Sequence, residues 1–571
     1  MKKLLKYIKP YTKECILGPL GKLCEATLEL IVPLVVAAII DRGIGEGDKG
    51  YLLLMVGVLC ALGLVGLGFS IVAQYFSAKA AVGFVTSVRH ALYEHIQTLS
   101  YADIDKLGTS TMITRMTTDA SRVQSGVNLA LRLLLRSPFV VFGALIMALI
   151  IDVSAGLVFA IVIPILSVII FGIMLITMPM YKRVQSGVDK ILARTRGNLG
   201  GVRVIRAFGK EDEEVSRFNE ENGMLTVAQA RAGHVSSLLN PMTYAVINLG
   251  IILLIYTGAI RVGDGVLSGG EVIALYNYMS QILIELIKLA NMIISISKAL
   301  ASCSRMAAVL DIVPSQSYGN VTSGDKSEYA VEFDGAALRY ASSSEESIRN
   351  INLKVKRGET VGIIGGTGSG KTTLVNLIPR FYDATEGEIR VNGVPVSRYS
   401  KEALVDMIGV VPQKATLFSG TVRENLAFGK DTSDEEMLRA LSIAQADSVI
   451  AEKGGLDSRV EAGGTNFSGG QKQRLTIARA LVKNPEILIL DDCASALDYA
   501  TDAALRTAIR THCEDTTVFI VSQRAASVMY ADKILVLEDG EAVGIGTHEE
   551  LLSSCEIYRE IYDSQFRRED A

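Results

Sequence analysis

The chain has 571 residues, which is too many for a single hydrophobic core, so two or more domains are expected. Hydrophobic residues make up 49% of the chain and charged residues only 21%, a composition that argues against a soluble protein and indicates membrane spans. The net charge of −4 leaves no polybasic signature for nucleic acid, and seven cysteines without C-x-x-C spacing argue against a zinc site or a disulfide framework.

The first half of the chain contains six apolar runs that are predicted to cross the membrane, of which the run 51–72 carries no charge and is long enough to cross a hydrocarbon layer of about 30 Å. A basic amphipathic segment comes first and is expected to lie along the membrane surface. The predicted spans cover about 14–40, 51–72, 131–151, 154–180, 244–260 and 272–296. Lysine and arginine concentrate before the first span and in the long loops after the second and fourth spans, which predicts that both termini lie in the cytoplasm.

Each of the two long basic loops has a mid-point that is predicted to form a short transverse helix, at 109–119 and at 197–211. Mixed apolar and basic residues there are suited to docking on another domain. The alternative is a solvated helical hairpin without such a contact.

Charged residues inside the predicted spans need partners or water. Glu285 and Lys288 are three residues apart on one helical face and are predicted to pair. Glu25 and Glu29 lie one turn apart, with Lys22 as the only nearby cation in the sequence. We hypothesise that these two glutamates line a translocation cavity; alternatively, the first span begins later and they lie near the interface.

Hydrophobic patterning stops after Asp311, and the Ser-, Gly- and Pro-rich stretch 313–327 is the predicted linker. It separates a predicted membrane domain, 1–312, from a second domain, 328–571. In the second domain short β-branched runs alternate with helical stretches, which predicts an α/β fold. The predicted strands are 330–333, 361–364, 388–391, 408–411, 487–490, 517–521 and 534–537.

The stretch 365–372 reads G-G-T-G-S-G-K-T and fits the phosphate-loop pattern G-x-x-x-x-G-K-[ST] between a predicted strand and a predicted helix. Glycines without a Cβ let successive N–H groups face a polyphosphate, Lys371 would neutralise the β- and γ-phosphates, and the Thr372 hydroxyl would sit on Mg²⁺. A chance glycine-rich turn is the alternative. The residues expected to bind nucleotide here are Gly365, Gly366, Thr367, Gly368, Ser369, Gly370, Lys371, Thr372 and Thr373.

Two further stretches extend this interpretation. The apolar run 487–490 ends in Asp491, which places a carboxylate at the carboxyl edge of the sheet, where it can join the Mg²⁺ shell. The stretch 467–471, F-S-G-G-Q, precedes a predicted helix and makes a second anion site. This chain thus has two phosphate-binding sites, whereas one nucleotide needs only one. We therefore infer that each site grips a nucleotide held by the opposite subunit. Tyr340 is a candidate to stack on adenine, although a lone aromatic is more often part of a core.

These residues resemble a half-transporter of the ABC exporter family. Residues 365–372 match Walker A and 487–491 match Walker B; the ABC signature is matched by Phe467, Ser468, Gly469, Gly470 and Gln471. Gln413 matches the Q-loop, which contacts the metal, Asp498 ends a match to the D-loop, and Tyr340 fits the A-loop aromatic. The resemblance implies an all-α six-helix transmembrane domain followed by an α/β P-loop nucleotide-binding domain. It also implies ATP and Mg²⁺ as cofactors and an amphipathic drug, lipid or peptide as substrate.

Two positions depart from the family pattern. The general base after Walker B is usually glutamate and here is Asp492, and the switch residue is usually histidine and here is Gln523. Asp492 is one methylene shorter, and Gln523 cannot carry a positive charge toward the γ-phosphate. The pairing resembles the degenerate subunit of heterodimeric bacterial multidrug exporters. It implies a partner half-transporter with both usual residues and a place in the bacterial inner membrane, with no nucleic acid as a partner.

Three alternatives remain open on the sequence. One is a homodimeric exporter in which Asp492 works as the base. Another is a nucleotide-gated channel or regulatory subunit that hydrolyses little ATP. The third is a soluble P-loop ATPase of the chromosome-structural type, which the membrane spans argue against.

Overall fold

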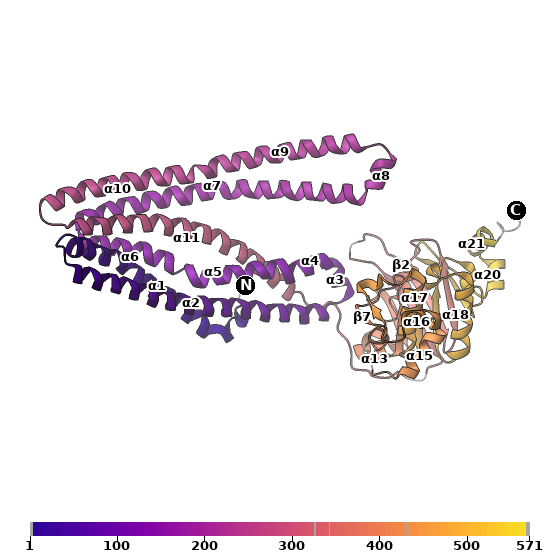
Figure 1. The fold of residues 1–571 in the computed structure, drawn as a ribbon. Coiled ribbons are helices and arrows are strands. Elements are labelled where there is room, and N and C mark those ends of the chain that lie inside the picture. Colours follow the sequence, from indigo (N-terminus) through magenta and orange to yellow (C-terminus); the bar gives the residue numbers. More distant parts are fainter. Residues whose placement is uncertain (1–3, 325–326, 342, 429–430, 567–571) are drawn as a thin grey trace. The chain divides into compact units, whose positions relative to one another are not determined.

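The computed structural model describes residues 4–324, 327–341, 343–428 and 431–566, and in it the chain divides into two compact units (Figure 1). The first unit comprises Met1–Gln97 and Ser110–Ile312, and the second comprises Thr98–Thr109 and Val313–Ala571. The second unit therefore includes a short segment that the sequence places within the first half of the chain.

The regular secondary structure described in the first unit is all helical. Among the described residues, six helical stretches are long and apolar enough to cross a membrane, as predicted: Lys9–Ile44, Lys49–Thr98, Thr109–Ile151, Val153–Gly200, Glu211–Gly263 and Gly269–Leu310. Their helices are α1 (Thr12–Ala38), α2 (Lys49–Thr98), α4 (Thr109–Thr114), α5 (Ala120–Leu133), α6 (Arg136–Ile151), α7 (Val153–Gly200), α9 (Glu211–Ser237), α10 (Leu239–Gly263) and α11 (Gly269–Leu310). A short helix, α8 (Val202–Ala207), joins α7 to α9 within the predicted segment 197–211 (Figure 1).

Charged side chains link three helices of this unit. The predicted pair between Glu285 and Lys288 is confirmed, with Nζ 2.9 Å from Oε1. Arg136 joins the same carboxylate at 2.8 Å and also reaches Glu29 at 2.5 Å, so α1, α6 and α11 are tied together by one guanidinium. Glu25 pairs with Lys22 at 2.5 Å. Each of these intramembrane carboxylates therefore has a cationic partner.

The separately capped helix in the loop after α2 lies earlier than the predicted segment 109–119. It is α3 (Tyr101–Leu107), and it belongs to the second unit. Ser100 and Asp103 form a capping box at its start, and Gly108, with φ 74°, ends it. The predicted segment itself is a continuation of the following helix, through α4 and a π-helical turn (Arg115–Asp119).

The second unit is an α/β domain, as predicted. A six-stranded sheet has the order β12-β11-β3-β10-β9-β6, in which β12 is antiparallel to β11 and the remaining pairs are parallel. A four-stranded antiparallel sheet has the order β2-β1-β4-β5. The strands are β1 (Tyr329–Leu338), β2 (Ile348–Lys356), β3 (Thr360–Gly365), β4 (Glu386–Val391), β5 (Val394–Pro395), β6 (Ile408–Val411), β7 (Gly420–Thr421), β8 (Arg459–Val460), β9 (Ile487–Asp491), β10 (Thr517–Val521), β11 (Lys533–Glu538) and β12 (Glu541–Gly546).

Every strand predicted from the sequence lies within an observed strand. Those of the parallel sheet were predictable because they are nearly continuous apolar runs that are largely buried. The main helices around the sheets are α12 (Lys371–Val375), α13 (Lys401–Met407), α14 (Val422–Leu426), α15 (Asp434–Ile443), α16 (Asp447–Lys453), α17 (Gly469–Leu481), α18 (Tyr499–His512), α19 (Ala525–Val528), α20 (His548–Ser554) and α21 (Glu556–Phe566).

Candidate functional site

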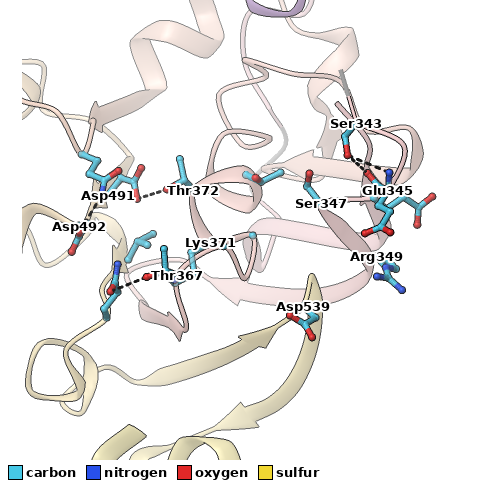
Figure 2. A pocket seen from close by; sticks show the side chains of 17 residues that line it. Ser343, Glu345, Ser347, Arg349, Thr367, Lys371, Thr372, Asp491, Asp492 and Asp539 are labelled. Atoms are coloured by element: carbon cyan, nitrogen blue, oxygen red, sulfur yellow. Dashed lines mark hydrogen bonds between the residues drawn. The ribbon is translucent and has the colours of Figure 1, made fainter. Parts of the chain in front are cut away.

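The glycine loop connects β3 to α12 at the carboxyl edge of the parallel sheet (Figure 2). A Cβ at Gly365 would lie 2.1 Å from the carbonyl oxygen of Leu537 on the neighbouring strand. At Gly370 the backbone has φ 94°, and a Cβ would lie 2.6 Å from the carbonyl oxygen of Ser347. Only glycine fits at these two positions, so the loop stays close to the sheet edge.

Lys371 is held by its own loop. Its Nζ donates to the carbonyl oxygens of Gly365 at 2.9 Å and Gly366 at 2.5 Å, and the residue is only 8% exposed. Burial lowers the pKa of the Lys371 ammonium, while the nearby carboxylates of Asp492 and Asp491 act in the opposite direction. A buried cation that is only partly compensated favours an anionic ligand.

Thr372 and Asp491 meet beside this lysine. The Thr372 hydroxyl donates to Asp491 Oδ1 at 3.0 Å (Figure 2). Burial raises the pKa of the Asp491 carboxyl, and the hydrogen bond from Thr372 acts against that rise. Hydroxyl and carboxylate oxygens are the ligand types that Mg²⁺ prefers, so these two side chains fit a magnesium ion.

The two residues that depart from the family pattern face the same cavity, which has a volume of about 660 Å³. Gln413 Nε2 donates to Asp492 Oδ2 at 3.2 Å, and Thr367 Oγ1 donates to Gln523 Oε1 at 3.5 Å. Asp492 adopts a left-handed backbone conformation, φ 48°, which aspartate tolerates better than most residues. The structure thus brings the glycine loop, Asp491, Asp492, Gln413 and Gln523 around one cavity.

Several residues that line this cavity were not predicted. They come from the connection between β1 and β2, from β2 itself, from the end of β10 and from the turn between β11 and β12: Ser343, Glu345, Glu346, Ser347, Arg349, Val521 and Asp539 (Figure 2). No local motif marks them, because only the order of the strands brings these turns to the glycine loop.

Tyr340 is half-buried and is not among the residues that line the cavity. Its hydroxyl donates to Thr373 Oγ1 at 3.1 Å, and its ring packs edge-on against Tyr382 with centroids 5.0 Å apart. Its stacking on adenine stays a prediction.

The signature residues also lie outside this cavity, at the start of α17. Ser468 and Gln471 form a capping box, in which Ser468 Oγ accepts the Gln471 N–H at 3.3 Å and Gln471 Oε1 accepts the Ser468 N–H at 2.9 Å. Ser468 and Gly469 are exposed, whereas Phe467 is buried. A Cβ at Gly470 would lie 3.1 Å from a backbone carbonyl oxygen. The serine and the first glycine are therefore accessible to a ligand from outside this chain's own cavity.

Asp498 caps α18 by accepting the Thr501 N–H at 2.7 Å, and hydrogen bonds from the Thr501 side chain and backbone lower the pKa of the Asp498 carboxyl. It is exposed and does not line the cavity.

Comparison with known proteins agrees with this arrangement. The ABC transporter transmembrane region family matches residues 15–286, and the ABC transporter family matches residues 348–495. The chain is an ABC exporter half-transporter. An uncharacterized ABC transporter ATP-binding protein of Bacillus subtilis is 35% identical over 572 residues, covering 100% of this half-transporter and 99% of that protein.

Two further relatives have more informative names. A putative multidrug export ATP-binding/permease protein of Bacillus subtilis is 31% identical, covering 99% of each chain. An ATP-dependent lipid A-core flippase of Hahella chejuensis is 30% identical, covering 100% of this half-transporter and 97% of that protein. The ABC exporter fold and ATPase-coupled transport follow from these matches.

Proposed function

We propose that this half-transporter is one subunit of a heterodimer that uses ATP to move amphipathic compounds out of the cytoplasm of a bacterial cell. The apolar spans and the relatives named for multidrug export and for a lipid flippase support this substrate class. Lysine and arginine bias in the long loops supports an inner-membrane protein with the nucleotide-binding domain in the cytoplasm.

The observation that carries the proposal is the mixture of intact and altered groups around one cavity. Lys371, Thr372 and Asp491 retain the binding groups of a Walker site. Asp492 and Gln523 occupy the positions of the general base and the switch residue. The cavity is therefore suited to hold ATP and poorly suited to hydrolyse it.

Each residue has a specific task in this pocket. On nucleotide binding, Lys371 would exchange its loop carbonyls for the β- and γ-phosphates, while Thr372, Asp491 and Gln413 would be the residues that hold Mg²⁺. When bound, Mg²⁺ neutralises charge on the phosphate oxygens. The Asp492 carboxylate falls short of the attacking water by about one C–C bond, and a misplacement near 1 Å lowers a rate by roughly a hundredfold.

The second task of this chain is to complete the partner's pocket. Ser468, Gly469 and Gly470 stand at the N-terminus of the 13-residue helix α17, where N–H groups and the helix dipole favour a phosphate. The partner, with glutamate after Walker B and histidine in the switch, holds the ATP that is hydrolysed. Gln471 helps to order this surface, because its Oε1 accepts the Ser468 N–H at 2.9 Å.

Helix α3 links domain closure mechanically to the membrane helices. The centroids of the Tyr101 and Phe381 rings are 4.6 Å apart, and Asp105 accepts a hydrogen bond from the Tyr382 hydroxyl at 2.6 Å. Because α3 is joined through the backbone to α2 and α4, its displacement pulls on both. ATP drives the change by binding the closed state more tightly than the open one.

ATPase measurements on the purified full-length chain, alone and with a partner half-transporter, test the proposal. Little activity is expected from this chain alone, and activity should appear with a partner that carries both usual residues. Ser468→Ala should abolish most of that activity. Ser433→Ala is the matched control, because Ser433 forms the same capping box at the start of α15 but belongs to no signature.

Two results would overturn the asymmetric mechanism. One is normal ATPase activity from the single purified chain, which would support a homodimer with Asp492 as a working base. The other is an Asp492→Ala variant that loses activity as fully as removal of the partner's glutamate. Nucleotide-dependent conductance without transport in vesicles would favour the channel or regulatory alternative.

A further inference from the structure

The last helix of the described chain contacts the backbone at the switch position, Gln523, and again two residues later. Gln565, near the end of α21, accepts the Ala525 N–H on Oε1 at 2.8 Å. Its Nε2 donates to the carbonyl oxygen of Gln523 at 2.9 Å. One side-chain amide thus bridges residues 523 and 525, with Arg524 between them.

This bridge supplies a helix cap that the local sequence does not provide. Ala525 is the first residue of α19, and the N-cap residue Arg524 makes no side-chain cap hydrogen bond. The Gln565 carbonyl therefore satisfies an N–H group that is otherwise left open at a helix start. The amide N–H on the same side chain fixes the preceding peptide at Gln523.

The helix that carries Gln565 is itself firmly packed. Tyr558 of α21 is fully buried in a cluster that includes Ala525 and Ile364, the residue before the glycine loop. Further along α21, the Tyr562 and Phe566 rings stack with centroids 4.5 Å apart, and both pack against that cluster. The amide of Gln565 is consequently held by elements that also support the phosphate loop.

We propose that Gln565 is a positioning residue for Gln523. The Gln523 side chain is exposed, and its Oε1 is 3.5 Å from the Thr367 hydroxyl, so side-chain contacts alone hold it weakly. Gln565 fixes the Gln523 carbonyl and the Ala525 N–H, and so holds the Gln523 side chain at the cavity where the γ-phosphate would lie. This inference rests on the proposed role of Gln523 as the switch residue, and it makes α21 a determinant of the preference for ATP over ADP in this chain's own pocket.

Nucleotide affinities of the full-length chain in detergent test this role. Displacement of trinitrophenyl-ATP by Mg-ATP and by Mg-ADP gives two affinities for each variant, and Lys371→Ala gives the background. Gln523→Ala and Gln565→Ala should each weaken ATP binding by about two- to tenfold, the loss expected for one or two hydrogen bonds, and leave ADP binding unchanged. The double variant should bind ATP as each single variant does, because both act through one contact.

Two further variants separate positioning from general folding. Gln565→Glu keeps the acceptor for Ala525 but loses the donor to Gln523, so it should also weaken ATP binding selectively. Ser564→Ala is the control on the same helix, since its hydroxyl bonds back to Ile561. Thermal unfolding of each variant reports whether α21 remains folded.

The outcomes are distinct. Equal weakening of ATP and ADP, additive losses in the double variant, or full ATP affinity in Gln565→Ala would overturn the inference. If Gln523→Ala weakens ATP binding and Gln565→Ala does not, only the inference fails. If Gln523→Ala itself leaves the ratio of ATP to ADP affinities unchanged, the proposed role of Gln523 fails and the inference fails with it.

Discussion

Restoring one methylene at Asp492 should restore part of the chemistry of this chain's own pocket. The Asp492 carboxylate accepts a hydrogen bond from Gln413 at 3.2 Å and faces the same cavity as Lys371, so its direction is already suited to a general base. Asp492→Glu advances the carboxylate by about 1.5 Å, the length of one C–C bond. Since an error of about 1 Å lowers a rate by roughly a hundredfold, hydrolysis at this pocket should rise by about that factor, which corresponds to about 2.7 kcal/mol of activation free energy.

The assay needs the pocket of this chain to be the only one that turns over. ATPase rates should therefore be measured in the assembly with a partner half-transporter whose own catalytic glutamate is changed to glutamine. Asp492→Asn is the matched control, because it keeps the size of the side chain and removes the base. A rate in Asp492→Glu no higher than in Asp492→Asn would refute the argument that side-chain length limits this pocket.

Other predictions concern charges held inside the fold. Burial raises the pKa of Asp491, so stability falls as the pH rises from the ordinary value of 3.8 through the raised pKa. Asp491→Asn should therefore raise the nucleotide-free melting temperature at neutral pH and lose the added stability from Mg-ATP. Glu285→Gln should lower the free energy of unfolding in detergent by about 3 kcal/mol, whereas Lys288→Ala, at a half-exposed side chain, should change it by less than about 1 kcal/mol. Burial raises the pKa of Asp103, but bonds from Ser315 and Ser100 outweigh it and hold that pKa below its ordinary value of 3.8. The stabilisation is therefore present above about pH 4 and is lost as the pH falls through the lowered pKa. Denaturant titrations from pH 7 to 3 should show a loss of about 1.5–3 kcal/mol at neutral pH in Asp103→Asn that disappears at the acid end.

The elements that could be predicted are those whose signal is local. Strands β9 and β10 contain the unbroken apolar runs 487–490 and 518–521, and each of the six spans has an apolar window of 18 residues, so these elements can be predicted without knowledge of their neighbours. Strand β2 was missed even though its buried and exposed residues largely alternate, because two consecutive exposed residues near its start interrupt the alternation. Helix α3 was placed too late, although the capping residues Ser100 and Asp103 and the terminating Gly108 were all readable.

The residues of the candidate site likewise fall into those that a local motif predicts and those that only the fold brings together. Lys371 and Asp491 belong to motifs whose spacing fixes their place, whereas Asp539 lines the cavity because β11 pairs with β3. In the membrane unit, the partner of Glu29 is Arg136, 107 residues away. No spacing rule connects two helices at that separation, so a charge that looked unpaired in the sequence is paired in the structure.

Asp492 and Gln523, the two residues that depart from the family pattern, still make polar contacts around the cavity. Asp492 still bonds Gln413, and Gln523 still bonds Thr367, so the polar contacts around the cavity survive. The pocket lacks a base long enough to reach the attacking water, and it lacks a positively charged switch residue. Both groups matter more for bond cleavage than for binding. On the proposed function, ATP in this pocket favours the closed state but is not consumed to reopen it. Reopening must then come from the pocket completed by Ser468, so each transport cycle would hydrolyse one ATP rather than two.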